Sequence, residues 1–231
     1  MPRIHAVLFA SAVALALAGG CASTLQQKPE APESLGFLAG VYDKLEPGSD
    51  GQVALRYENP NANWSQYHQI LLDPVQFWAG DESKLSPDAA QMLTTYFYNA
   101  MKENLEKGGF SLAQLPGPGV LRAQLALLDA SAATPIMRTV SLVVPQALLI
   151  NSAQRLFSDK YAFSGHIEVA LRASDAQTGA LLAAGLDRRS GGGGIQQAAQ
   201  WKWGDAEAAM DHWAQLFTKR LQEFQARMRA R

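Results

Sequence analysis

Asp187, Arg188 and Arg189 form the most chemically suggestive run in this chain, and four glycines, Gly191–Gly194, follow closely. Two guanidinium groups beside mobile backbone amides can bind an anion such as a phosphate or a carboxylate. In the simpler interpretation, Asp187 pairs with an arginine and the glycines only connect a strand to a helix. We favour this structural interpretation because no nucleophilic partner is visible in the sequence, and we keep Arg188 and Arg189 as candidate ligand-binding residues.

His166 is the other candidate ligand-binding residue, because Ser164 lies two positions before it. Residues two apart in a strand share a face, so the hydroxyl group can contact the imidazole ring. One hypothesis is therefore a hydrolase or transferase that uses His166 together with Asp187–Arg189. The alternative is a strand histidine whose hydrogen bonds are satisfied locally or by water.

The histidines beyond residue 20 are His68, His166 and His212, and none lies at metal-ligand spacing from another or beside a cysteine. The sequence has no H-E-x-x-H motif, no P-loop and no G-x-S-x-G nucleophile elbow. We therefore expect no metal, no cofactor and no enzymatic activity. His212 is expected to face solvent on the polar flank of a helix.

Cys21 is the only cysteine of the chain, and it ends a short apolar leader that begins with one positive charge at Arg3. A charged start, about a dozen apolar residues and a small-residue cleavage site are typical of a secretory signal. The apolar run is shorter than the about 20 residues that span a bilayer as a helix. The alternative is an ordinary secreted protein with an incidental free thiol. A free thiol is unfavourable in an oxidising compartment, so a modified Cys21 is the better explanation.

The small-small-Cys ending of the leader is similar to the lipobox of bacterial lipoproteins, in which the thiol is acylated and becomes the mature N-terminus. It departs from the usual pattern because Ala18 holds the place of a leucine, and Leu17 lies one position earlier. The resemblance implies a signal peptide over residues 1–20 and a lipid anchor on Cys21, with the membrane as partner. Ala22 stands where an aspartate would resemble the inner-membrane retention signal, so we expect the outer membrane, on its periplasmic face.

Residues 21–34 are interpreted as the lipidated cysteine followed by a flexible tether, because the segment is polar and contains prolines. Fully extended, the tether over residues 22–34 reaches roughly 40 Å, at about 3.3–3.6 Å per residue. The folded unit is expected to cover residues 35–231. The chain has 20 basic and 21 acidic residues, and cleavage removes one basic residue, so no positive surplus would favour a nucleic-acid partner.

Apolar periodicity divides the folded unit into strands and two long helices. Ser86 and Pro87 begin the first helix, which ends at two glycines, and Asp205 begins the second. A turn over residues 175–179 predicts a hairpin between two antiparallel strands. The predicted fold is α+β in the order β-α-β-β-β-α: a single domain with a largely antiparallel sheet and helices on one face. Strand patterns occupy residues 53–57, 67–78, 120–128, 161–172 and 180–189.

Residues 139–154 interrupt this order, because they carry no charge and contain Pro145. They lie between two strands that a short connection would join. One interpretation is an apolar helical insertion that is buried as a crossover. The other is an exposed apolar surface that meets a protein partner or the lipid bilayer.

Six short segments of the folded unit together resemble a known family. They are Gly36–Leu38, Asn59–Trp64, Ile70–Val75, Pro116–Arg122, Asp187–Arg189 and Trp203–Asp205. The sequence is similar, over roughly Leu35 to the C-terminus, to the bacterial lipoproteins known as domain of unknown function 3313 (DUF3313). The resemblance implies a lipid-anchored envelope protein. It implies no reaction, because the family has no assigned activity or catalytic residues.

The leading hypothesis is a non-catalytic lipoprotein that binds or scaffolds another component of the cell envelope, with an envelope protein as the expected partner. It depends on the anchor, the tether, the apolar insertion and the missing catalytic motifs. Two alternatives stay open. An envelope hydrolase requires His166 and Asp187 to converge in one cleft, and a small-ligand or lipid-binding module requires an apolar cavity of about 300–1,000 Å³.

Overall fold

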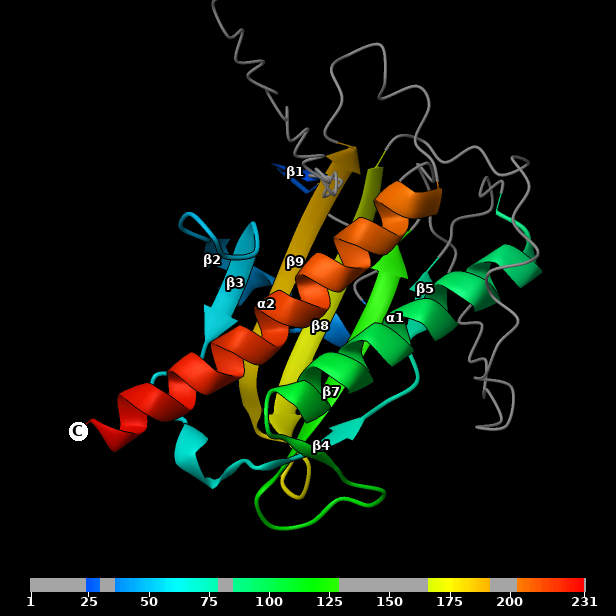
Figure 1. Cartoon of the computed structure of the whole chain (residues 1–231). Helices are drawn as coiled ribbons and strands as arrows, with labels where there is room; N and C mark the ends of the chain where they lie inside the picture. Colours follow the sequence, from blue (N-terminus) through cyan, green and yellow to red (C-terminus); the bar gives the residue numbers. More distant parts are fainter. Residues whose placement is uncertain (1–23, 30–35, 79–84, 129–165, 192–202, 231) are drawn as a thin grey trace, which may run out of the picture.

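The computed structural model describes residues 24–29, 36–78, 85–128, 166–191 and 203–230, and within them two long helices lie on one face of a nine-stranded sheet (Figure 1). Neighbouring strands follow the order β2-β3-β9-β8-β7-β4-β6, with β1 paired to β9 and β5 paired to β7. The predicted α+β class, single domain and largely antiparallel sheet are confirmed, although the described residues hold more strands than the predicted order did. The strands are β1 Thr24–Gln27, β2 Glu46–Pro47, β3 Leu55–Glu58, β4 Gln69–Leu72, β5 Gln76–Trp78, β6 Ser111–Leu112, β7 Val120–Leu128, β8 His166–Asp175 and β9 Leu181–Gly191.

The antiparallel centre of the sheet is formed by β7, β8 and β9. The turn between β8 and β9 is stabilised by Asp175, whose Oδ1 accepts hydrogen bonds from the backbone N–H groups of Gln177 at 3.0 Å and Thr178 at 2.7 Å. Gly179 has φ +72°, a left-handed conformation that glycine adopts without steric cost. The predicted hairpin over residues 175–179 is therefore confirmed.

One edge of the sheet is parallel, which the sequence pattern did not predict. The expected strand over residues 67–78 is divided at Pro74, which has no backbone N–H to donate, into β4 and β5. Both pieces pair with β7 in the parallel direction. The long helix α1 (Pro87–Lys107) lies between them and β7 in sequence, and such a crossover allows two adjacent strands to run the same way.

Helix α1 spans Pro87–Lys107, as the capping pattern predicts. The Oγ of Ser86 accepts a hydrogen bond from the N–H of Ala89 at 3.2 Å, and proline occupies the first turn. Beyond the C-terminal end, Gly109 adopts φ +87°. The largest buried side chains on the inner face of α1 are Leu93, Phe97, Met101 and Leu105.

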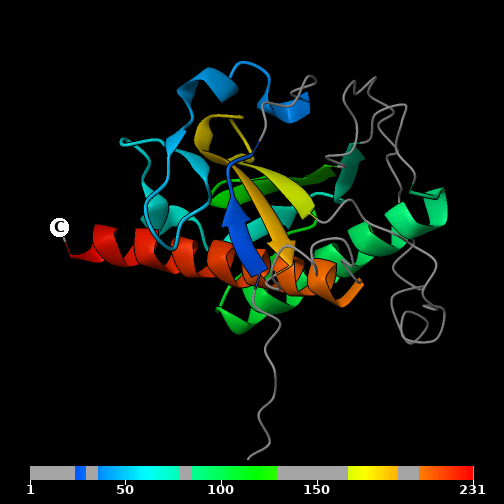
Figure 2. The same ribbon diagram turned by 90° about the horizontal axis from the view of Figure 1, so that it is seen from above.

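Helix α2 spans Trp203–Arg229 and lies beside α1 on the same face of the sheet (Figures 1 and 2). The two helices approach closely at Gly108, where an added Cβ would lie 2.3 Å from the Cγ2 of Thr218. The apolar stripe of α2 faces the sheet. Its buried members are Ala206, Met210, Trp213, Phe217 and Leu221.

The opposite face of the sheet is covered by two short helical turns, η1 Gly36–Leu38 and η2 Tyr42–Lys44, as Figure 2 shows. Because side chains alternate across a strand, Leu125 of β7 packs toward the helices while Ala126 packs toward these turns. Both faces of the sheet centre are therefore buried. The second core consists of Leu38, Val41, Trp78, Ala126, Leu128, Ala170, Ala184 and Leu186.

Strand β1 corrects the prediction of a flexible tether over residues 22–34. Thr24–Gln27 pair antiparallel with the last residues of β9, so the ordered domain begins before Leu35. The sequence Thr-Leu-Gln-Gln has no apolar alternation, and the strand is held by backbone pairing and by glutamine side chains instead. Residues 1–23 and 30–35 lie outside the described residues, as does the predicted apolar insertion over 139–154.

Candidate functional site

The carboxylate of Asp187 is fully buried and accepts four hydrogen bonds. Its Oδ1 accepts from Gln26 Nε2 at 2.6 Å and from the backbone N–H of Ala54 at 2.9 Å. Its Oδ2 accepts from Trp213 Nε1 at 2.7 Å and from Arg189 Nε at 3.2 Å. A buried charge is tolerated only when it is paired and hydrogen-bonded in this way. Asp187 thus joins β1, the chain before β3, β9 and α2, which confirms the interpretation that it pairs with an arginine.

Arg189 lies on the same side of the sheet as Asp187 and is only 8% exposed. Its Nη1 donates to the Oγ1 of Thr24 at 3.1 Å, so the guanidinium also holds the start of β1. His212 of α2 is half-buried near this pair and not solvent-facing as predicted. Burial and the positive charge of Arg189 lower the pKa of His212, although Asp187 acts in the opposite direction.

Arg188 lies on the other face of β9, because successive side chains alternate along a strand. Its guanidinium contacts the Nε2 of His166, and its Nε lies 3.3 Å from the Oε1 of Glu168. The structure therefore brings two of the predicted ligand-binding residues, Arg188 and His166, together and places Arg189 on the opposite face. The hydrolase hypothesis requires His166 and Asp187 to converge in one cleft. In the structure they lie on opposite faces of the sheet and do not converge.

The predicted lipidation site, Cys21, lies outside the described residues, as does Ser164. Within the described residues, no three histidine, cysteine, aspartate or glutamate side chains are grouped so that they could hold a metal ion. None of the helices in the described part of the chain is both long and apolar enough to cross a bilayer.

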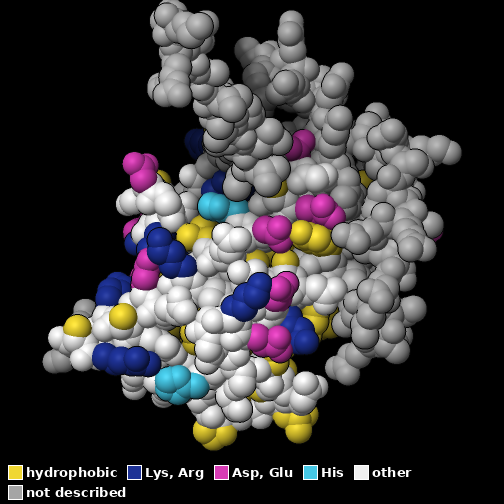
Figure 3. All heavy atoms as spheres, viewed as in Figure 1, with side chains coloured by type: hydrophobic (Ala, Val, Ile, Leu, Met, Phe, Trp, Pro, Cys, Tyr) yellow, Lys and Arg dark blue, Asp and Glu magenta, His cyan; other side chains and the backbone are white. Residues whose placement is uncertain are grey.

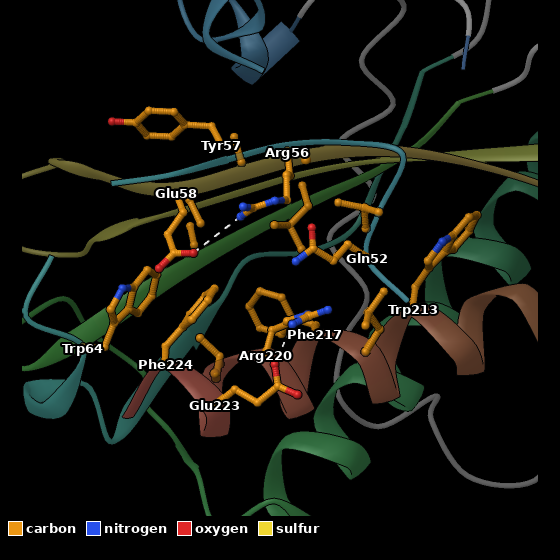
Figure 4. A pocket seen from close by; sticks show the side chains of 18 of the residues that line it. Gln52, Arg56, Tyr57, Glu58, Trp64, Trp213, Phe217, Arg220, Glu223 and Phe224 are labelled. Carbon is orange, nitrogen blue, oxygen red and sulfur yellow. Dashed lines mark hydrogen bonds and ion pairs between the residues drawn. The ribbon is translucent and has the colours of Figure 1, made fainter. Parts of the chain in front are cut away.

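An apolar groove of about 520 Å³ runs between α2 and the sheet (Figure 4). We call it the α2 groove. Its floor is formed by β7, β8 and β9, one wall by β3 and the chain before it, and the other wall by α2. Its apolar lining residues are Val53, Tyr57, Trp64, Leu125, Val169, Leu171, Ala173, Ala183, Ala184, Gly185, Trp213, Leu216, Phe217, Leu221, Phe224 and Ala226.

The groove exists because small residues form part of its floor. Ala173 and Ala183 lie opposite each other on β8 and β9 and both line the groove. At one end of the groove lies Trp213, which the Asp187 hydrogen bond holds in place. At the other end the rings of Trp64 and Phe224 pack with their centroids 4.5 Å apart (Figure 4). Aromatic residues therefore form both ends of the α2 groove.

The mouth of the groove is charged, and two contacts cross it. Arg227 of α2 forms a 2.5 Å ion pair with Glu58 of β3, and Arg220 Nη2 donates to the carbonyl oxygen of Gly51 at 3.0 Å. Arg56 also pairs with Glu58, at 3.4 Å. The molecular face that carries α2 shows basic and acidic side chains close to one another (Figure 3). The α2 groove is therefore apolar inside and has charged contacts across its mouth.

The residues of this groove were missed by the sequence analysis. A local signal exists for two of them, since Arg220 and Arg227 are seven positions apart and border the apolar stripe of α2. Their contacts with Gly51 and Glu58 depend on the pairing of β3 with β9, over residues far apart in sequence.

Comparison with known proteins identifies a family and several distant likenesses among solved structures. The family model described as "Protein of unknown function (DUF3313)" matches residues 33–217. No curated protein matches the chain. Among solved structures, the PelC dodecamer from Paraburkholderia phytofirmans is similar at 8% identity and a TM-score of 0.35, covering 70% of this chain and 94% of that one.

Two further likenesses are equally distant. A DUF4136 family protein from Bacteroides thetaiotaomicron has 11% identity and a TM-score of 0.37, with 72% of this chain and 94% of that chain covered. Protein XCC0632 from Xanthomonas campestris, of family DUF330, has 11% identity and a TM-score of 0.32, with 74% and 96% covered. At such scores the likenesses carry no functional information. The family match, by contrast, covers most of the chain, and the protein belongs to the DUF3313 family of proteins of unknown function.

Proposed function

We propose that this protein is a non-catalytic, lipid-anchored protein of the bacterial outer membrane that binds an apolar small molecule in the α2 groove, on the periplasmic side. The observation that carries the proposal is the groove itself. A volume of about 520 Å³ lies within the range of about 300–1,000 Å³ that is typical of small-molecule sites. The mainly apolar lining, with a few charged groups at the mouth, is the composition such sites usually have.

The size of the groove argues that it is a site and not a packing defect. Protein interiors are close-packed, and voids larger than a water molecule are few. Here the aromatic rings of Trp213 and Phe217 line an open space above small floor residues. Leaving such apolar surface uncovered has a cost in free energy, which a bound apolar ligand would recover.

The residues that an enzyme would need support binding better than catalysis. All four hydrogen bonds of the Asp187 carboxylate are used within the fold, and His166 lies on the opposite face of the sheet from that carboxylate. A general base must lie within hydrogen-bond reach of the group that it activates. The envelope hydrolase is therefore the weaker alternative.

The lipid anchor in this proposal rests on the leader and on Cys21, and β1 adds a consequence. Cys21 is three positions before Thr24, which is paired in β1. Three extended residues reach about 10 Å, at about 3.3–3.6 Å per residue. An acylated Cys21 would thus hold the domain close to the bilayer, at the end of the sheet where β9 ends. An envelope protein as binding partner remains a prediction from the sequence.

The binding proposal is tested by titrating residues 21–231, carrying Cys21→Ala to prevent acylation, with the neutral dye N-phenylnaphthylamine. Ala183→Leu places a larger side chain on the groove floor, whereas Ala180→Leu makes the same change at an exposed position in the hairpin. We expect dye binding that falls at least tenfold in Ala183→Leu and is unchanged in Ala180→Leu. Equal binding by both variants, or no binding by the parent chain, would disprove the proposal.

A further inference from the structure

The shape of the α2 groove restricts what can occupy it. Its lining on α2 extends from Trp213 to Arg227, which is about 21 Å along the axis at about 1.5 Å per residue. The contacts of Arg220 and Arg227 with the opposite wall cross the mouth at two points about 10 Å apart, by the same helical rise. An apolar groove of this length, beneath two crossing contacts, suits a linear apolar chain that lies lengthwise.

The charges at the mouth restrict the ligand further. The charged residues that line the groove are three arginines, Arg56, Arg220 and Arg227, and two glutamates, Glu58 and Glu223. Among these lining residues there is one positive charge more than negative charges. The mouth therefore complements an anionic group better than a cationic one.

The existing ion pairs show how an anionic group would be held. Glu58 bridges two guanidinium groups, at 3.4 Å from Arg56 and 2.5 Å from Arg227. The arginine side chains are 37% and 55% exposed. Ion pairs at such exposure contribute little to stability, so an incoming anion can replace the glutamate at small cost. Arginine is also well suited to hold carboxylate or phosphate oxygens with two parallel hydrogen bonds.

Resting on the proposed function, we propose that the α2 groove binds a single-chain amphiphile: one linear acyl chain along the floor and an anionic head group at Arg56 and Arg227. Fatty acids and monoacyl phospholipids share this chemistry. Glu58 occupies the head-group position in the absence of ligand. The residue therefore acts as an internal competitor, and its removal strengthens binding of an anionic ligand.

Calorimetric titration of residues 21–231 carrying Cys21→Ala tests the chain and the head group separately. Affinity for decanoate, dodecanoate and tetradecanoate, each below its micelle concentration, should rise about fourfold per methylene until the groove is full. Monoacyl phosphatidylglycerol of the same chain length distinguishes the two sources. Tighter binding of the phospholipid assigns a lipid head group, and tighter binding of the free acid assigns a fatty acid.

Charge variants test the head-group assignment. We expect Glu58→Gln to raise the affinity for tetradecanoate twofold to fivefold, and Arg227→Gln to lower it by a similar factor. Tetradecyltrimethylammonium, with the same chain and the opposite charge, should respond in the opposite sense. The control is Lys107→Gln, which removes an exposed charge on α1 outside the groove.

The outcomes separate this inference from the proposed function. Binding of both amphiphiles with no opposite response to Glu58→Gln would overturn the anionic head group and leave an apolar site. Binding of neither amphiphile, with the fold intact by circular dichroism, would overturn this inference. The proposed function would fall only if N-phenylnaphthylamine also fails to bind. An affinity that does not change with chain length would overturn the linear acyl chain.

Discussion

The indole Nε1 of Trp213 donates a 2.7 Å hydrogen bond to the Oδ2 of Asp187, and this contact fixes α2 against β9. The same tryptophan ring lines one end of the α2 groove. Asp187 belongs to the charged run that suggested an anion site, but it does not line the groove. Instead, it holds in place the helix that forms the groove wall.

The first prediction concerns this buried carboxylate. Asp187→Ala leaves four donors without their acceptor, and breaking a buried ion pair in this way costs about 3–5 kcal/mol of unfolding free energy. Trp213→Phe removes one hydrogen bond and costs about 1–3 kcal/mol. Urea unfolding followed by circular dichroism measures both. Asp50→Ala, at an exposed position, is the control, and an equal effect in all three variants would contradict the role assigned to Asp187.

The second prediction concerns the distance between the domain and the bilayer. If Cys21 is acylated and β1 is paired, inserting six Gly/Ser residues between Ser23 and Thr24 allows the domain to move outward by up to about 20 Å. The same insertion between Ala31 and Pro32 should not move it, because β1 stays attached to β9. Neutron reflectometry of the lipidated protein on a supported bilayer measures the height. An equal displacement by both insertions would show that β1 does not carry the anchor.

The third prediction separates a steric clash from backbone strain on the second face of the sheet. Gly36 has φ +43°, and an added Cβ would lie 2.2 Å from the Cζ2 of Trp78. Gly40 has φ +72° but nothing within 4 Å of the same position. Gly36→Ala should therefore destabilise the fold by about 1–3 kcal/mol more than Gly40→Ala does, because the clash adds to the strain. Thermal unfolding compares the stabilities of the two variants. An equal loss of stability in both would contradict the close contact between η1 and Trp78.

The fourth prediction concerns pH. Burial and the Arg189 charge lower the pKa of His212 below its ordinary value of 6.5, so the unfolded chain binds a proton that the folded chain does not. Stability should therefore fall as the pH decreases below about 6.5, the ordinary value for histidine. His212→Gln should reduce that fall, whereas the same change at the exposed His68 should not. Urea unfolding between pH 7.5 and pH 5 at about half-unit steps decides it; a larger acid loss in His212→Gln would contradict the sign.

Local signals predicted the elements that local chemistry controls. The cap at Ser86 and the turn at Asp175 gave α1 and the β8–β9 hairpin, because each feature depends on residues a few positions apart. The groove could not be predicted in this way. Its Arg227–Glu58 contact joins residues 169 positions apart, and depends on which strand lies beside β9. Strand β1 was missed because polar side chains, and not apolar alternation, hold it.

The central claim is that the space between α2 and the sheet holds an anionic, single-chain amphiphile. Native mass spectrometry of the full protein, extracted in a mild detergent from the cells that produce it, tests this most directly. The account predicts a non-covalent adduct with the mass of such an amphiphile, present with Ala180→Leu and lost with Ala183→Leu. An adduct that persists in Ala183→Leu, or wild-type protein that carries none, would contradict it.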